Sequence, residues 1–81
     1  REKVNSQGDN WIRYESGLQL CWNSWIDADA WWSFPVAFSG TPAVTITARA
    51  GDWQWVGDLS NTGFTNKGSG GACAIAVGRW K

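Results

Sequence analysis

The sequence predicts a small all-β protein, a compact antiparallel β-sandwich of six or seven short strands. Apolar and polar residues alternate with a period of two from Trp11 onward, which is typical of half-buried strands. Turn-forming clusters of Gly, Pro, Asn, Asp and Ser interrupt the alternation about every 8 to 12 residues, as in antiparallel sheets. No segment combines a helical period with a capped run of helix formers. The 81 residues suffice for one domain.

The first ten residues, REKVNSQGDN, are polar apart from Val4 and carry no strand pattern. Such a segment is typical of a linker, so residues 1–10 are interpreted as a linker or the end of an upstream stalk. Residues 11–81 are then the β-sandwich domain. The chain starts at Arg1 rather than at a methionine, which favours a piece of a longer protein. No apolar run approaches the roughly 20 residues that span a membrane, so we expect no membrane insertion.

Strands in the first half follow Gly17 and the turn at 27–29. Between them, Leu18, Leu20 and Trp22 face one way, and the residues that alternate with them, Gln19, Cys21 and Asn23, face the other. After the turn, the alternation places Ala30, Trp32 and Phe34 opposite Trp31 and Ser33, and Pro35 ends that strand. We expect Trp22 and Trp32 to belong to the core.

Strands in the second half are separated by turns at 39–42 and 51–52 and by a glycine-rich loop at 68–71. The clearest strand places Val44, Ile46 and Ala48 on one face. Shorter strands are expected at 53–56 and 62–65, and the last strand at 72–80. Small residues occupy alternate positions of that last strand: Ala72, Ala74, Ala76 and Gly78. They indicate either a subunit interface with close backbone approach or a crowded place beside a tryptophan.

Composition excludes several classes of function. Seven basic and seven acidic residues give zero net charge, and the basic residues are scattered, which argues against a nucleic-acid partner. Without histidine, the chain has no Ser-His-Asp or Cys-His catalytic set and lacks the commonest zinc ligand. Paired aspartates, Asp27 with Asp29 and Asp52 with Asp58, are the only catalytic groups left, and turn positions explain them better. We expect neither an enzyme, a metal site nor a cofactor.

The two cysteines, Cys21 and Cys73, leave two alternatives open. A disulfide between them would close a long loop and stabilise the fold by roughly 4 kcal/mol. Alternatively, both are free thiols that pack as small apolar residues.

Eight tryptophans in so short a chain indicate a binding surface as well as a core. Flat indole faces can stack on the C–H face of a sugar ring, while nearby polar side chains bond its hydroxyls. One such mixture surrounds the turn at 51–52, and a second surrounds the turn at 27–29. The candidate ligand-binding residues are Trp53, Trp55, Asp52, Gln54 and Asp58 at the first turn, and Trp25, Trp31 and Asn23 at the second.

Motifs in a fixed order extend from Trp11 to Trp80. They are WIRY at 11–14, SGL at 16–18 with Leu20 and Trp22, FPVAF at 34–38, PAV at 42–44, NTGFT at 61–65 and a small-residue last strand. This order resembles the C-terminal receptor-binding tip domain of bacteriophage tail fibres, and also the H-type lectin fold. The extra tryptophans and both cysteines depart from the pattern, so no binding residue carries over from the family.

The resemblance implies a homotrimer at the end of an upstream fibre shaft, exposed on the virion outside the cell. It also implies recognition of a host surface polysaccharide or lipopolysaccharide. Two alternatives stay open: a structural cap that trimerises and terminates the fibre, and a stand-alone lectin.

Overall fold

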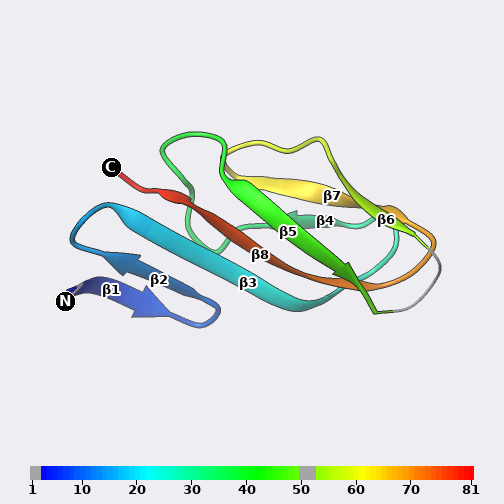
Figure 1. Cartoon of the computed structure of the whole chain (residues 1–81), viewed down its shortest axis with the longest axis horizontal. Coiled ribbons are helices and arrows are strands. Elements are labelled where there is room, and N and C mark those ends of the chain that lie inside the picture. Colours follow the sequence, from blue (N-terminus) through cyan, green and yellow to red (C-terminus); the bar gives the residue numbers. More distant parts are fainter. Residues whose placement is uncertain (1–2, 50–52) are drawn as a thin grey trace.

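The computed structural model describes residues 3–49 and 53–81, in which eight β-strands form two antiparallel sheets (Figure 1). The strands are β1 (Val4–Gly8), β2 (Trp11–Tyr14), β3 (Leu18–Ile26), β4 (Trp31–Ser33), β5 (Ala43–Ala48), β6 (Gln54–Gly57), β7 (Gly63–Gly68) and β8 (Ala72–Arg79). No helix that could span a membrane occurs in this described part of the chain. The predicted all-β class is confirmed.

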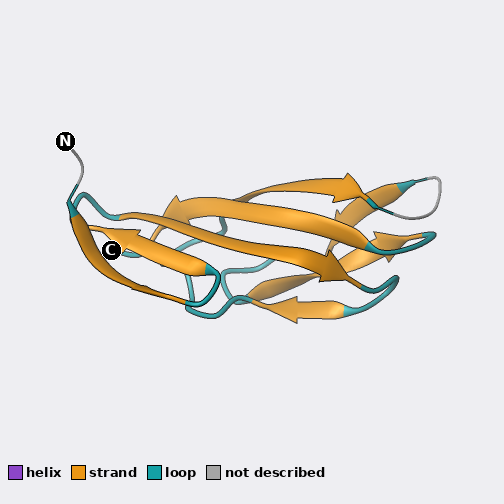
Figure 2. Ribbon diagram, turned by 90° about the horizontal axis from the view of Figure 1, so that it is seen from below, coloured by secondary structure: helices purple, strands orange, loops and turns teal. Residues whose placement is uncertain are grey.

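The larger sheet has the strand order β1-β2-β3-β8-β5 and the smaller sheet the order β4-β7-β6. Seen from below, the strands lie in two layers joined by loops, as in a β-sandwich (Figure 2). The molecule is elongated, 39 × 19 × 17 Å. The β1–β2 hairpin extends the larger sheet at the end of the molecule that holds both termini (Figure 1).

The fold has one strand more than the six or seven predicted. Residues 4–8, interpreted from sequence as linker, form β1, and Gly8 pairs with Trp11 across a tight turn. Asn10 in that turn has a φ of 66°, a left-handed conformation that asparagine tolerates better than most residues. The sheet therefore begins before the boundary expected at Trp11. A strand at a sheet edge needs no apolar pattern because little of it is buried, which explains why its polar sequence gave no signal.

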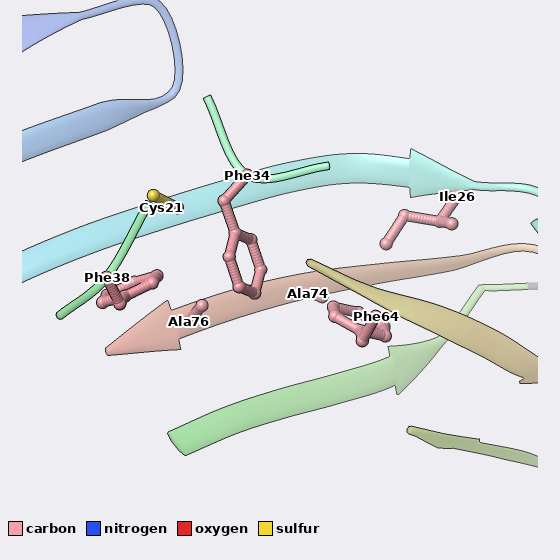
Figure 3. Close-up of a cluster of buried hydrophobic side chains, with 7 residues drawn as sticks. All are labelled: Cys21, Ile26, Phe34, Phe38, Phe64, Ala74 and Ala76. Atoms are coloured by element: carbon pink, nitrogen blue, oxygen red, sulfur yellow. The ribbon is translucent and has the colours of Figure 1, made fainter. Parts of the chain in front are cut away.

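The core between the sheets is built on phenylalanine. Phe34, Phe38 and Phe64 are buried, and Phe34 meets Phe38 edge-to-face with ring centroids 5.1 Å apart. Trp32 is half-buried and packs edge-to-face on Phe34 at 5.0 Å, as its predicted place in the core requires. Figure 3 shows the three phenylalanine rings gathered around the small side chains of β8. Edge-to-face contacts of this kind are the favoured aromatic geometry.

The small-residue row of β8 faces this core. Ala72 and Ala76 are fully buried, and a Cβ added to Gly78 would lie 2.9 Å from Cδ1 of Phe38. The row is small because the aromatic rings of the opposing layer need the space. The interpretation of this row as a crowded place beside an aromatic ring is therefore correct, but the rings are those of phenylalanine and not of tryptophan. The subunit-interface interpretation of the same row is wrong.

The side chains of β3 alternate between two faces as predicted, but the face that is buried is the opposite of the one expected. Gln19 and Cys21 point into the core, while Trp22 points outward and is 38% exposed. Gln19 can be buried because its amide is bonded: Nε2 donates to the Val36 carbonyl at 3.1 Å, and Oε1 accepts from Nε of Arg13 at 2.7 Å. The expectation that Trp22 is a core residue is wrong.

Both cysteines are free thiols. Cys21 lies in the core, whereas Cys73 lines the outer surface of the same sheet, so one sheet separates the two side chains. The structure therefore supports the free-thiol alternative and not the disulfide between Cys21 and Cys73.

Candidate functional site

One end of the molecule lies opposite both termini and carries several of the candidate binding residues. At that end β3 finishes at Ile26, whose partner on β8 is Ala72, and Ala72 also pairs with Ala48 at the end of β5. The smaller sheet contributes the start of β4, the start of β6 and the end of β7. The termini lie at the other end, where Leu18 pairs with Arg79 (Figure 1).

Trp31 and Trp55 lie on the outer face of the smaller sheet. Phe64 and Asn66 of the central strand β7 are buried, so Thr65 and Lys67 between and after them face outward. Trp31 pairs with Thr65, and Trp55 pairs with Lys67. The two tryptophans are about half-exposed and flank β7 from opposite sides. We name Trp31, Trp55, Thr65 and Lys67 the tryptophan platform.

Two glycines leave room for the long side chains of the platform to lie against the sheet. The ring of Trp31 covers Gly63, where an added Cβ would lie 2.7 Å from Cζ2 of the indole, and Nε1 donates to Oγ of Ser33 at 2.8 Å. The stem of Lys67 crosses Gly57, where an added Cβ would lie 2.6 Å from Cγ. Sheet geometry separates the α-carbons of the two platform tryptophans by about 12 Å.

Trp53 continues the edge of the platform. It precedes β6 by one residue and is 56% exposed, and its carbonyl accepts from the backbone N–H of Ser69 at 3.1 Å. Because side chains of an extended chain alternate, Trp53 and Trp55 share a side of that edge. Both tryptophans of this candidate pair are exposed.

Trp25 lies in a separate cluster on the larger sheet, together with Asn23 and Asp27. Nε1 of Trp25 donates to Oδ1 of Asp27 at 2.7 Å, and Oδ1 of Asn23 accepts from the backbone N–H of Trp25 at 3.1 Å. The indole packs over Gly71, where no side chain would fit. These contacts fix the ring at the rim of the β3–β4 loop, with half of its surface exposed.

Of the three remaining candidates, Gln54 and Asp58 lie outside the platform. Gln54 is half-buried and ties the start of β6 to the β7–β8 loop, because its Nε2 donates to the Gly70 carbonyl at 2.9 Å. Asp58 follows β6 at the end away from Trp53 and has a left-handed φ of 54°, a turn conformation. Asp52 lies outside the described residues.

The buried amide of Asn66 holds this end of the molecule together. It is fully buried, and its Nδ2 lies 2.9 Å from the Ile26 carbonyl and 3.2 Å from each of the carbonyls of Asp27 and Gly70. One side chain therefore ties the end of β3 and the β3–β4 loop, which lies between Trp25 and Trp31, to the β7–β8 loop. Sequence reasoning did not find Asn66.

The arrangement is suited to binding. The Asp27 carboxylate accepts a hydrogen bond from the Trp25 indole, and Asp29 has a φ of 57° in the turn that follows. The first aspartate pair, Asp27 with Asp29, therefore consists of turn residues, as expected. The described residues contain no group of three or more His, Cys, Asp or Glu side chains that could hold a metal ion. The platform offers indole faces, one hydroxyl and one ammonium group, which together suit a hydroxylated ring.

The sequence contained a signal for the two platform residues that were missed. Alternation around Phe64 places Thr65 and Lys67 on the face opposite the core, beside whichever strands pair with β7. Only the tertiary pairing shows that Trp31 and Trp55 are those neighbours.

No protein-family model, curated protein or solved structure matches this chain.

Proposed function

We propose that the chain is the receptor-binding tip of a phage or phage-derived tail fibre and attaches the particle to a glycan on the host cell surface. The observation that carries the proposal is the tryptophan platform, which exposes two supported indoles at the end opposite the chain termini. An upstream shaft joined at the terminal end would present the platform to the cell. The motif order from Trp11 to Trp80 supports the same assignment.

Binding at the platform rests on stacking rather than on deep enclosure. Indole faces stack on the apolar face of a pyranose, and Thr65 and Lys67 bond its hydroxyl groups. An exposed, shallow site gives weak binding per copy. Three copies in a homotrimer, and several fibres on a virion, multiply such an affinity by about 10² to 10⁴. The protein acts outside the cell as a binding module and not as an enzyme.

A second candidate function is a structural cap that trimerises and ends the fibre while recognition takes place elsewhere. It is favoured by the outer face of the larger sheet, where Leu20 of β3 pairs with Val77 of β8, and Ile12 and Ala43 lie beside them in the same row. Val77 is 36% exposed and Ile75 is 40% exposed, so this face carries an apolar surface without a cover in the single chain.

The test is a binding screen of the 81-residue chain against neutral host polysaccharides and lipopolysaccharides, with its mass in solution measured in parallel. We expect saturable binding, with a loss of about 5- to 150-fold in Trp31→Ala and in Trp55→Ala, since one lost stacking contact costs about 1 to 3 kcal/mol. Trp80→Ala removes an equally large side chain at the end of the molecule that holds the termini, away from the platform, and is the matched control.

Two outcomes would contradict the receptor-binding proposal. If neither platform variant weakens binding while both keep the parent circular dichroism spectrum, the platform is not the site. If the parent forms trimers that bind no cell-surface material, the cap is the better assignment.

A further inference from the structure

The outer face of the larger sheet contains a hollow of about 340 Å³, separate from the tryptophan platform. It lies over β3, β8 and β5 in the half of the sheet far from the termini. Cys73 and Ile75 of the central strand β8 form its apolar floor. The remaining lining residues are Trp22, Asn23, Ser24, Thr45, Thr47, Arg49 and Ala74. Its volume falls within the range of about 300 to 1,000 Å³ typical of small-molecule sites.

The lining of the hollow is mostly apolar, but a few hydrogen-bonding groups at its rim have no partner among the described residues. The hydroxyls of Thr45 and Thr47 and the indole N–H of Trp22 have no hydrogen bond to any described residue. Arg49 uses one N–H, because its Nη1 donates to the Ser24 carbonyl at 3.3 Å. A guanidinium has five N–H groups, so this contact fixes the side chain and leaves donors for a ligand.

Charge complementarity identifies the kind of ligand. Among the described residues that line the hollow, Arg49 is charged and none carries a carboxylate. A guanidinium binds a carboxylate through two parallel hydrogen bonds, which is the strongest and most directional contact it makes. The partly exposed indole of Trp22 lies on the same face and offers an apolar surface. A ligand that suits both has an apolar ring face and one carboxylate.

We propose that this hollow binds a single acidic sugar, a pyranose that carries a carboxylate. The ring stacks on Trp22 above the floor of Ile75 and Cys73. The hydroxyls of Thr45 and Thr47 bond the ring hydroxyls, and the Arg49 guanidinium holds the carboxylate. Arg49 makes the site select acidic over neutral sugars, whereas the platform contains no arginine. The inference does not depend on the fibre assignment, because it uses only the residues of this face.

The experiment is titration calorimetry of the full 81-residue chain with methyl glucuronide and with methyl glucoside, which differ in the carboxylate. We expect the glucuronide to bind about tenfold more tightly. Arg49→Gln should remove that preference, and Trp22→Ala should weaken the binding of both sugars. Trp80→Ala, at the end of the molecule that holds the termini, should leave the glucuronide affinity unchanged and is the matched control.

Several results would overturn the proposal. These are equal affinity for the two sugars, no heat of binding at millimolar sugar, or a glucuronide affinity that Arg49→Gln does not change. Tighter binding of methyl glucoside 6-phosphate than of the glucuronide would assign the site to phosphate instead. If Thr47→Glu converts an oligomeric parent into monomers, the hollow is an interface between copies. If the chain binds the glucuronide but the platform binds no glycan, the proposed function is contradicted and the present inference is not.

Discussion

The buried polar side chains Gln19 and Asn66 form hydrogen bonds to the backbone of loops. Both are fully buried: Gln19 donates to the carbonyl of Val36 in the β4–β5 loop, and the Asn66 amide lies within bonding distance of the carbonyls of Asp27 and Gly70 in two further loops. A carbonyl buried without a donor costs about 1 to 3 kcal/mol, so each amide supplies a partner that the loop backbone lacks. The consequence is local order: Gln19 fixes the chain at Val36, and Asn66 fixes the β3–β4 loop between Trp25 and Trp31.

Cys21 makes stability depend on pH at the residue scale. Burial raises the pKa of its thiol above the ordinary value, and the nearby Gln19 amide and Arg13 guanidinium offset this only in part. In the unfolded chain the thiol ionises near pH 8.5. Above that pH the unfolded state therefore binds fewer protons than the native state, and the free energy of unfolding falls as pH rises.

We expect the urea midpoint of the parent to fall between pH 7.5 and about pH 10 by more than that of Cys21→Ser, whose hydroxyl does not titrate. Cys73→Ser is the control and should follow the parent. Equal pH dependence in all three proteins would show that Cys21 ionises alike in the folded and unfolded states.

Strand β8 determines how closely the two sheets pack. Its inward side chains are alanine and glycine, and its outward side chains, Cys73, Ile75 and Val77, are larger. A strand with a core face usually buries its larger residues. Here the rings of the opposing layer fill the core, so the strand that crosses beneath them must be small.

An isobutyl side chain in place of a methyl on the inward face of β8 should therefore be costly. We expect Ala76→Leu to lower the free energy of unfolding by about 1 to 3 kcal/mol, because Phe34 and Phe38 cannot move apart without loss of their edge contact. Val77→Leu adds a methylene to the outward face of the same strand and should change stability by less than about 0.5 kcal/mol. Denaturant unfolding measures both. Similar values for the two variants would show that the core is loose at Ala76.

At the scale of the whole molecule, the two outer faces differ in chemistry. The outer face of the smaller sheet carries the platform, in which Lys67 lies beside exposed indoles. The outer face of the larger sheet has an apolar half near the termini and the hollow in its far half. The row of Ile12, Leu20, Val77 and Ala43 is the surface that we expect the copies of a homotrimer to cover.

We expect the parent to have the solution mass of three chains and Val77→Glu to have the mass of one, because a buried carboxylate without a partner is unfavourable at an apolar contact. Light scattering measures the masses, and circular dichroism shows whether the fold is kept. Lys67→Glu, on the other sheet, should stay trimeric. A monomeric parent would refute self-association through this face.

The sequence by itself determined the strands, because the period-two alternation and the turn residues are local signals. Seven of the eight strands lie where the pattern placed them, and only β1, a polar strand at a sheet edge, carried no such signal. The shared parity of Trp53 and Trp55 placed them on one side of their strand but left open whether that side is buried, and the structure shows both exposed.

The tertiary structure alone decided which face of each strand is buried and which strands are neighbours. Alternation divides β3 into two faces but does not say that bonded Gln19 belongs inside and Trp22 outside. Likewise, the platform exists because β7 pairs with β4 and β6, which brings Trp31, Lys67 and Trp55 together from distant parts of the chain. Side-chain pattern is a property of one strand, whereas a binding surface is a property of strands in register.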